Sequence, residues 1–557
     1  MRLRLRRADS ESRLDEALAE PGPAPHLPDG WRRPRRSGRG TTIGTLDGVG
    51  RSLVDPAGLV TLPGASWSLD WWIGAEDRWH LPAEEVAVRQ RLQSSAPVVE
   101  TRLRVPSGDA VQRAYGARSA TGDDVVVIEV ENQSKVPFAV ALAVRPATDA
   151  GRGRIATIGL EGTTVRVDGA VALVLPRSPG RATLATGADG DAAVIVLAGA
   201  ANTVRAGSVD CGDGLANAAL LFPLAHAATL RVVLPLSGRA VSPDEVPGPA
   251  DVASGWRRQV ERGARIEVPD RRLRDAVAAS ARHLLLAEPS PAVAKGLDLL
   301  GFDEAAAAAL GATVLAHGAS PAAPGAALAA LGRHWDLTHD LAFALEAIDA
   351  VGALVAGLAA AEPAQQALGH AALGAVARLL DAAGQPRAAT DVRRLVARAG
   401  DDGAVASLAD RLREASSTWT WPGPGAAHEP AANAEVVAAV RELLVTEADD
   451  GLSLSPTVPE PWLGQGWELH DLPTRHGRLS FAVRWHGERP ALLWQLEPHA
   501  DTSAVVVRLS VPGLDPSWST TEPTGEALLA PVALPEPAPR RGLTLPVTIE
   551  PLHRGAS

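Results

Sequence analysis

The stretch VVVIEVENQSKVPFAVALAV, residues 125–144, decides the class of fold for the first half of the chain. Residues 125–132 and 138–144 are β-branched and apolar, and the short polar turn between them is typical of a β-hairpin. Short strands bounded by Gly and Asp turns indicate a large antiparallel β-sandwich over residues 41–246. Further apolar runs that predict strands of this sandwich stand at 98–105, 171–175, 193–197 and 229–234.

The composition changes after Pro247. Residues 271–410 contain 45 alanines in 140 positions, with Leu and Val at helical spacing and with Gly and Pro between the runs. This pattern predicts about eight helices between residues 270 and 447, arranged as α-hairpins. Apolar alternation then returns, for example over Arg478–Trp485. The predicted fold class is therefore multidomain: an N-terminal antiparallel β-sandwich, an Ala-rich α-hairpin domain, which the resemblance described below implies is toroid-like (α/α), and a small C-terminal β domain.

A chain of 557 residues is too long for one compact core, so several domains are expected. Their predicted bounds are a basic, loosely ordered leader (1–40), the sandwich (41–246), a linker (247–269), the α-hairpin domain (270–447) and the C-terminal β domain with a loose, Pro-rich tail (448–557). Within that tail, residues 543–549 alternate well enough to predict an edge strand.

The charge and the cysteine count narrow the class of protein. The formal net charge of −11 argues against a nucleic-acid partner. The single cysteine, Cys211, excludes an internal disulfide and suits a reducing compartment. No apolar run reaches membrane-spanning length, and the acidic residues Asp9 and Glu11 stand where a signal peptide needs an apolar stretch. We therefore expect a cytoplasmic protein without a membrane partner, and the sequence leaves its oligomeric state open.

Neither a metal nor a cofactor is expected. The Gly212-Asp213-Gly214 turn is not a phosphate loop, because neither a Lys nor the required Gly spacing follows it. The histidines of the helical region lack the spacing of a metal site. They are His283, His317, His334, His339, His370 and His428.

Tryptophan is unusually frequent and clustered, with fourteen Trp against five Phe and one Tyr. A Trp offers a broad flat face and one N–H donor, and beside polar residues it favours a sugar-binding surface. The cluster over 67–80 has a second interpretation: a packed seam where the sandwich docks on the helices, with Trp71 or Trp72 meeting another domain. The candidate ligand-binding residues are Trp71, Trp72, Asp77, Arg78, Trp79, Trp335, Trp419 and Trp421.

Three stretches carry a resemblance to a known superfamily. They are RHWDLTHDLAF at 333–343, residues 418–441 with the following Gly451-Leu452-Ser453-Leu454, and the run from Gly477 to Trp494. With the domain order, they resemble the six-hairpin glycosidases, namely glucoamylase-like, trehalase-like and debranching-type enzymes and related glycoside phosphorylases. The resemblance implies two carboxylates flanking the scissile bond at the mouth of the helical toroid.

The sequence also departs from this superfamily. No Asp or Glu occurs between Ala305 and Trp335, where a catalytic acid is expected, and the connections between helices are short. The candidate carboxylates are Glu429, Asp336 and Asp340, although Asp340 is also expected to cap a helix that begins near Leu341. A carboxylate at a helix start, such as Glu429, is most often a cap as well.

Three hypotheses about function follow. The leading one is a cytoplasmic, glycosidase-like protein that binds an α-glucan or a related oligosaccharide, with weak or no hydrolysis. The first alternative is an active inverting glycoside hydrolase or a glycoside phosphorylase. The second is a non-catalytic structural protein whose tryptophan clusters are domain seams. A pair of acids facing each other across a pocket would distinguish the first alternative from the other two.

Overall fold

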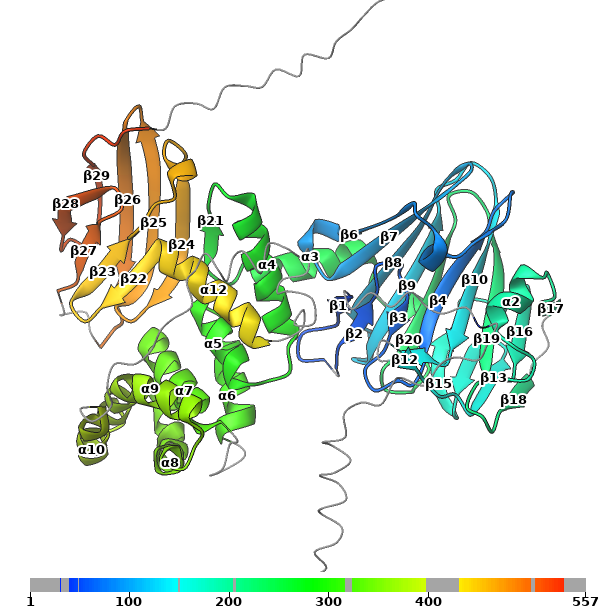
Figure 1. Cartoon of the computed structure of the whole chain (residues 1–557), viewed down its shortest axis with the longest axis horizontal. Helices are drawn as coiled ribbons and strands as arrows, with labels where there is room; N and C mark the ends of the chain where they lie inside the picture. The colour runs from blue at the N-terminus through cyan, green and yellow to red at the C-terminus, as the bar shows by residue number, and fades with distance from the viewer. Residues whose placement is uncertain are drawn as a thin grey trace, which may run out of the picture.

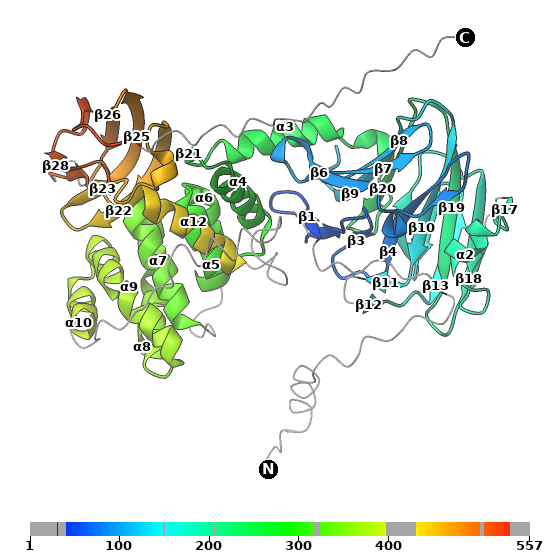
Figure 2. The same cartoon turned by 45° about the horizontal axis from the view of Figure 1, so that its top comes forward.

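The chain forms three parts in sequence order: an N-terminal pair of β-sheets, a central group of helices and a smaller C-terminal pair of sheets (Figure 1). The N-terminal sheets occupy one end of the elongated molecule, and the helices and C-terminal sheets lie together at the other (Figure 2). This architecture confirms the predicted fold class. The structure is a computed structural model that describes residues 31, 40–48, 50–148, 151–203, 207–315, 323–396, 430–501 and 506–534.

The first sheet of the sandwich has the strand order β1-β2-β3-β4-β10-β19-β16-β17, and β5 pairs with β4. Its neighbouring strands are antiparallel. The bounds are β1 (Thr41–Ile43), β2 (Ser52–Val54), β3 (Val60–Thr61), β4 (Ser68–Gly74), β5 (Trp79–His80), β10 (Phe138–Arg145), β16 (Arg181–Ala185), β17 (Asn202–Thr203) and β19 (Asn217–Leu224).

The second sheet has the order β18-β13-β14-β15-β20-β9-β8-β7-β6, again with antiparallel neighbours. A separate two-stranded ribbon joins β11 (Ala147–Thr148) and β12 (Gly151–Arg152). The bounds of the second sheet are β6 (Val88–Leu92), β7 (Val98–Val105), β8 (Gly108–Arg118), β9 (Asp124–Asn132), β13 (Thr157–Glu161), β14 (Thr164–Val167), β15 (Ala170–Val174), β18 (Gly207–Asp210) and β20 (Thr229–Pro235).

The stretch 125–144 forms two strands as predicted, but the predicted hairpin is wrong. Strand β9 pairs with β8 and β20 in the second sheet, whereas β10 pairs with β4 and β19 in the first. The turn is a corner held by Asn132, whose Nδ2 donates to the carbonyl oxygens of Val136 (2.9 Å) and Leu224 (3.0 Å). Both strands are almost wholly buried, so each finds partners inside its own layer.

A second correction concerns residues 193–197, which form helix α2 (Ala192–Leu197) instead of a strand. A short apolar run fits a buried strand and a buried helix equally well, and periodicity alone does not separate them. Here Asp191 caps the helix by accepting a hydrogen bond from the backbone N–H of Ala193 at 3.1 Å. The helix covers the outer face of the first sheet, where Ala193 and Val196 share an apolar cluster with Trp72.

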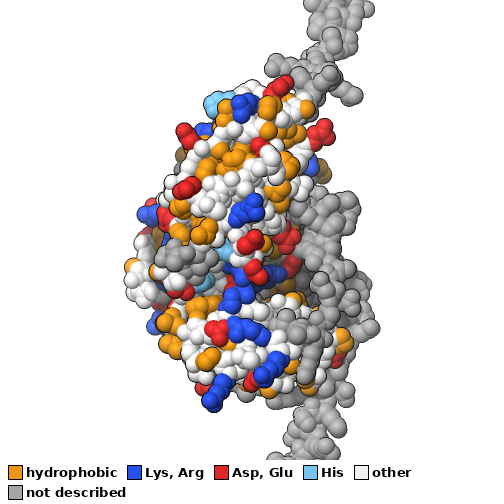
Figure 3. Space-filling view, turned by 90° about the vertical axis from the view of Figure 1, so that its left-hand side faces the viewer, with side chains coloured by type: hydrophobic (Ala, Val, Ile, Leu, Met, Phe, Trp, Pro, Cys, Tyr) orange, Lys and Arg blue, Asp and Glu red, His pale blue; other side chains and the backbone are white. Residues whose placement is uncertain are grey.

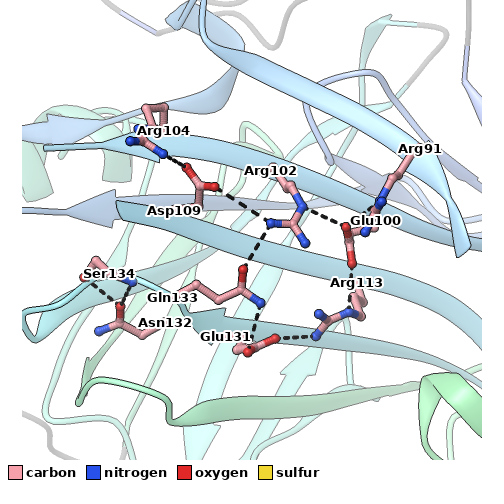
Figure 4. A network of polar contacts seen from close by, with 10 residues as sticks. All are labelled: Arg91, Glu100, Arg102, Arg104, Asp109, Arg113, Glu131, Asn132, Gln133 and Ser134. Carbon is pink, nitrogen blue, oxygen red and sulfur yellow. Dashed lines mark hydrogen bonds and ion pairs between the residues drawn. The ribbon is translucent and has the colours of Figure 1, made fainter. Parts of the chain in front are cut away.

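The outer face of the second sheet is divided into two halves. Its apolar half belongs to a cluster that also contains Trp256 of helix α3 (Pro249–Val260) and Leu286 of helix α4 (Arg271–Leu286). Its polar half carries a network of ion pairs (Figure 4). In that network Glu100 accepts from Arg91 at 2.7 Å and from Arg102 at 2.8 Å. Burial raises the pKa of Glu100, but the guanidinium groups around it lower it further, below its ordinary value.

The segment 247–269, expected as a linker, is a structured connection. Helix α3 packs against β7 and β8, and β21 (Arg265–Glu267) then pairs with β24 (Trp467–Thr474) of the C-terminal domain. Where α3 begins, the single O–H of Tyr115 is shared between two acceptors, Glu129 (3.0 Å) and the carbonyl oxygen of Pro247 (3.2 Å). The segment therefore fixes the sandwich to the rest of the molecule.

In the described part of the chain, eight α-helices lie between Arg271 and Leu444, and residues 397–429 of the predicted helical region lie outside that part. Proline near the first position starts several of them, where its missing N–H costs nothing. Besides α4 they are α5 (Pro291–Leu299), α6 (Asp303–Leu310), α7 (Pro324–Thr338), α8 (Leu341–Leu358), α9 (Pro363–Ala382), α10 (Pro386–Val396) and α12 (Pro430–Leu444).

The C-terminal domain consists of two small sheets, and the predicted strand over Arg478–Trp485 is confirmed as part of β25. One continuous apolar core joins these sheets to the helices, running from Ile266 to Leu529. The predicted strand at 543–549 lies outside the described residues. The bounds are β22 (Val445–Ala448), β23 (Gly451–Leu454), β25 (Gly477–His486), β26 (Arg489–Glu497), β27 (Arg508–Val511), β28 (Asp515–Thr520) and β29 (Thr524–Leu528).

Among the described helices, α8 is long and apolar enough to cross a membrane by length and composition, with a mean hydropathy of 1.9. It packs against α7 and α9 within the helical domain. On the face formed by the helices and the C-terminal sheets, acidic and basic side chains are interspersed with apolar ones, so neither sign of charge dominates it (Figure 3).

Candidate functional site

Two of the three candidate carboxylates are engaged in structural contacts. Asp336 on α7 receives two hydrogen bonds from the guanidinium of Arg378 on α9, at 2.9 and 2.7 Å. Asp340 accepts from the backbone N–H of Phe343 at 3.0 Å, which confirms that it caps α8. Glu429 lies outside the described residues, as do Trp419 and Trp421. Their proposed roles stay predictions.

Trp71 and Trp72 are buried inside the sandwich domain, with 0% and 1% of their surface exposed. The indole of Trp71 lies between the two sheets and donates to the carbonyl oxygen of Ala57 at 2.9 Å. The indole of Trp72 lies on the opposite face of β4, beneath α2. The two rings thus face different surroundings, as strand geometry requires. Neither presents a face to a ligand, and neither lies in the cluster that joins the sandwich to the helices.

The neighbouring polar residues form a small paired group at the surface. Arg78 makes an ion pair with Glu85 at 2.5 Å, and His80 lies between Glu85 (3.0 Å) and Asp77 (2.9 Å). Trp79 is half-buried and packs against the Trp72 cluster. Asp77, Arg78 and Trp79 each already have a partner in the fold. A ligand role for them stays a prediction.

Trp335 marks the contact between the helices and the C-terminal domain. It is 5% exposed and stacks on His339, with ring centroids 5.0 Å apart. His339 in turn stacks on His499 at 4.0 Å, and its Nδ1 lies 2.8 Å from Asp501. The stack is therefore an interdomain contact.

A buried acid–histidine pair in the helical domain was missed by the sequence analysis. Nδ1 of His334 lies 2.8 Å from Oδ1 of Asp298, and both side chains are at most 1% exposed. Burial raises the pKa of Asp298. Burial alone lowers the pKa of His334, but the hydrogen bond and charge of Asp298 raise it above its ordinary value. Periodicity places both residues on apolar helix faces, so it gives no signal that they meet.

Asp303, at the start of α6, is a partly exposed acid whose charge acts on both members of this pair. It forms an ion pair with Arg478 of β25, and burial raises its pKa. A carboxyl group with a raised pKa can act as a proton donor. However, two-carboxylate glycoside hydrolysis needs a second, facing acid, and Asp336 and Asp340, the two described candidates for it, are occupied elsewhere. Among the described residues, no group of three or more His, Cys, Asp or Glu side chains is arranged to hold a metal ion.

The sandwich contains an open cavity of about 670 Å³, within the range of small-molecule sites. Three loops form it: the loop between β3 and β4, the β11–β12 ribbon and the turn at 212–214. The segment after β12 is held between the other two, because the N–H of Arg154 donates to Ser66 (3.0 Å) and the N–H of Ile155 donates to Gly214 (2.9 Å). The polar residues of its lining are Thr61, Ser66, Thr148, Arg152, Arg154 and Asp213.

A smaller, mainly apolar cavity of about 270 Å³ adjoins the first one. The two share Leu62 and Ala65, and Trp67 lies in the wall of the smaller one. Trp67 belongs to the 67–80 cluster but was not among the candidate ligand-binding residues, and it is itself only 7% exposed. The polar residues of the larger cavity come from three distant segments, and no local pattern predicted that these segments meet.

The chain is thus a three-part protein with a sandwich, a helical domain and a C-terminal β domain, and the two cavities described above lie in the sandwich. No protein-family model matches the chain, and no curated protein matches it. Among solved structures, it is similar to a protein described as "Putative kojibiose phosphorylase from human microbiome", with a TM-score of 0.43 and 8% sequence identity over 88% of this chain and 90% of that one. A likeness this distant assigns no activity to this chain.

Proposed function

We propose that this protein binds a carbohydrate, an α-glucan or a related oligosaccharide, and hydrolyses it weakly or not at all. The observation that carries the proposal is the double cavity of the sandwich. Its larger part is lined by Thr, Ser, Arg and Asp residues, and its smaller part is lined mainly by apolar residues, including Trp67, which is 7% exposed. A sugar offers the matching surfaces, since its hydroxyl groups need hydrogen bonds and its C–H faces pack on aromatic rings.

The proposal of weak or absent hydrolysis rests on the contacts that the acids of the helical domain make. Asp336 is held by Arg378 and Asp340 caps α8, so each would lose a structural contact on turning to a substrate. Asp303 is a single acid paired with Arg478. We also propose a cytoplasmic location, in keeping with the single cysteine, Cys211, which is buried and free.

Calorimetric titration of the full chain with maltoheptaose tests the binding. Asp213 lines the cavity, and Asp213→Ala should weaken binding at least about tenfold, because it removes an acceptor for sugar hydroxyls. Asp210→Ala is the matched control, since Asp210 is an exposed acid on β18 outside the cavity. If no glucan releases heat, or if both variants bind like wild type, the proposal fails.

Release of reducing sugar from maltose, trehalose and aryl glucosides tests the second half of the proposal. We expect rates near background. Robust turnover that disappears in Glu429→Gln would instead establish an active glycosidase and assign the catalytic role to that residue.

A further inference from the structure

Resting on this proposed carbohydrate site, we propose that the larger cavity takes a saccharide that carries an anionic group, a carboxylate or a phosphate, and that Arg152 and Arg154 bind that group. The inference deepens the proposed function by naming the chemical class of the sugar. It rests on the state of the two guanidinium groups, on the residues around them and on the construction of the loop that holds them.

Both guanidinium groups are oriented by backbone oxygens and not by acids. Nη2 of Arg152 donates to the carbonyl oxygen of Asp213 at 3.0 Å, and Nη2 of Arg154 donates to that of Gly212 at 3.4 Å. Neither arginine forms an ion pair with a carboxylate of the described residues. A guanidinium has five N–H donors in a fixed fork that fits a carboxylate or a phosphate. Each therefore keeps unused donors beside the cavity.

Among the described residues that line the cavity, positive charge exceeds negative charge. Its described lining includes two arginines and one acid, Asp213, so the charges sum to +1. Asp213 would repel an anion at close range, but it accepts hydrogen bonds from the hydroxyl groups of a sugar. The wall thus has one part suited to an anion and another suited to hydroxyls, which favours an anionic saccharide over a bare anion.

Two glycines allow the arginines to lie along this wall. A Cβ on Gly153 would come within 1.8 Å of the carbonyl oxygen of Ser66, so only glycine lets the chain pass the β3–β4 loop at that point. Gly214 has a φ of +68°, and a Cβ there would come within 2.5 Å of the Arg154 side chain. The loop is therefore shaped so that the Arg154 side chain can lie against the 212–214 turn.

Arginines elsewhere on the sandwich provide a contrast. Arg91, Arg102 and Arg113 converge on Glu100, and Asp109 and Glu131 supply two further carboxylates, so the charges are matched within the protein (Figure 4). Arg166 resembles the cavity arginines, since it donates to the carbonyl oxygen of Gly169 at 3.3 Å and is exposed, as Arg154 is, but it stands on β14 and does not line the cavity. It is the matched control for the cavity pair.

The test measures binding of four probes to the full chain by calorimetry: glucose 1-phosphate, glucuronate, maltotriose and inorganic phosphate. We expect the two anionic sugars to bind more tightly than maltotriose and than inorganic phosphate, and their affinity to fall with added salt. Arg152→Gln and Arg154→Gln should each weaken binding of the anionic sugars roughly tenfold. Arg166→Gln should leave it unchanged. The better of the two anionic sugars identifies the group as phosphate or carboxylate.

The outcomes separate this inference from the proposed function. If maltotriose binds as tightly as the anionic sugars and the arginine variants change nothing, the inference is overturned while carbohydrate binding stands. If inorganic phosphate binds as tightly as glucose 1-phosphate, the cavity is a simple anion site and the inference fails. If the anionic sugars bind through the arginines but maltoheptaose does not bind, the inference holds and the α-glucan assignment fails.

Discussion

Replacing Trp256 by alanine should separate the melting of the sandwich from that of the rest of the molecule. Trp256 is 6% exposed on α3, in the apolar cluster shared by the sandwich, α3 and α4. Burying a Trp removes up to about 200 Å² from water, or about 5 kcal/mol at about 25 cal/mol per Å². This is an upper bound, and Trp→Ala changes in cores cost about 3–5 kcal/mol.

The assay is differential scanning calorimetry of the full chain. Wild type should unfold in one transition, because α3 holds the sandwich to the helices. Trp256→Ala should show two transitions, with the lower one roughly 6–20 °C below that of wild type. Trp462→Ala is the matched control, since Trp462 is equally buried but lies in the core shared by the helices and the C-terminal domain. Trp462→Ala should destabilise that core without disturbing the apolar cluster that joins the sandwich to α3 and α4.

A single transition in Trp256→Ala with an almost unchanged melting temperature would refute this reasoning. The fragment 41–246 gives an independent check. It lacks α3 and therefore exposes the apolar half of the second sheet, including Val98, Val127 and Val233. It should be poorly soluble, and a soluble fragment that melts like the intact domain would show that the seam contributes little.

Three further predictions concern charged groups. Asp340→Ala should lower stability by about 1 kcal/mol in urea unfolding through loss of the α8 cap, with no effect on sugar binding; loss of binding would give Asp340 a role beyond the cap. Burial raises the pKa of Asp55 to about 7, so the stability that protonated Asp55 contributes is complete below its ordinary pKa of 3.8 and is lost as the pH rises through about 7. Asp55→Asn keeps the acceptor for the N–H groups of Ala57 and Leu59, and it should abolish this loss of stability between pH 5 and pH 8. A variant with the same pH profile of stability as wild type would contradict this prediction. Because the pKa of His334 is raised in the folded state, the stability that the protonated ring contributes is complete below about pH 6.5 and is lost as the pH rises through the folded pKa. The urea midpoints at pH 6 and pH 8 should therefore differ more in wild type than in His334→Asn. Equal differences would show that His334 does not cause the pH dependence.

Local sequence determined most of the strands and helices, although the short apolar run at 193–197 was predicted as a strand and forms helix α2. The alternation over Arg478–Trp485 fixed β25, because a half-buried strand needs period-two burial. The Asp340 cap and the prolines near the first helical turns fixed where helices start, since these signals act on neighbouring backbone groups. Such features depend on contacts a few residues apart, and one sequence is enough to predict them.

The candidate sites depend on residues that are distant in sequence. His334 meets Asp298 across two helices, and the cavity joins Ser66, Arg152 and Asp213 from three loops. Nothing in the local pattern distinguishes these residues from other polar residues in turns or on helices. The tryptophan cluster shows the same limit: its composition favoured a ligand surface, while packing placed Trp71 and Trp72 in the interior.

The stretch 125–144 shows both sides of this division. Its β-branched, apolar composition determined that both of its runs are strands, because such side chains fit a pleated, buried surface. Whether they pair with each other is not a local property. Both strands are buried, so each takes the neighbours that complete its own layer, and the hydrogen bonds of Asn132 turn the chain between layers. Only the tertiary structure made the expected hairpin a corner of the sandwich.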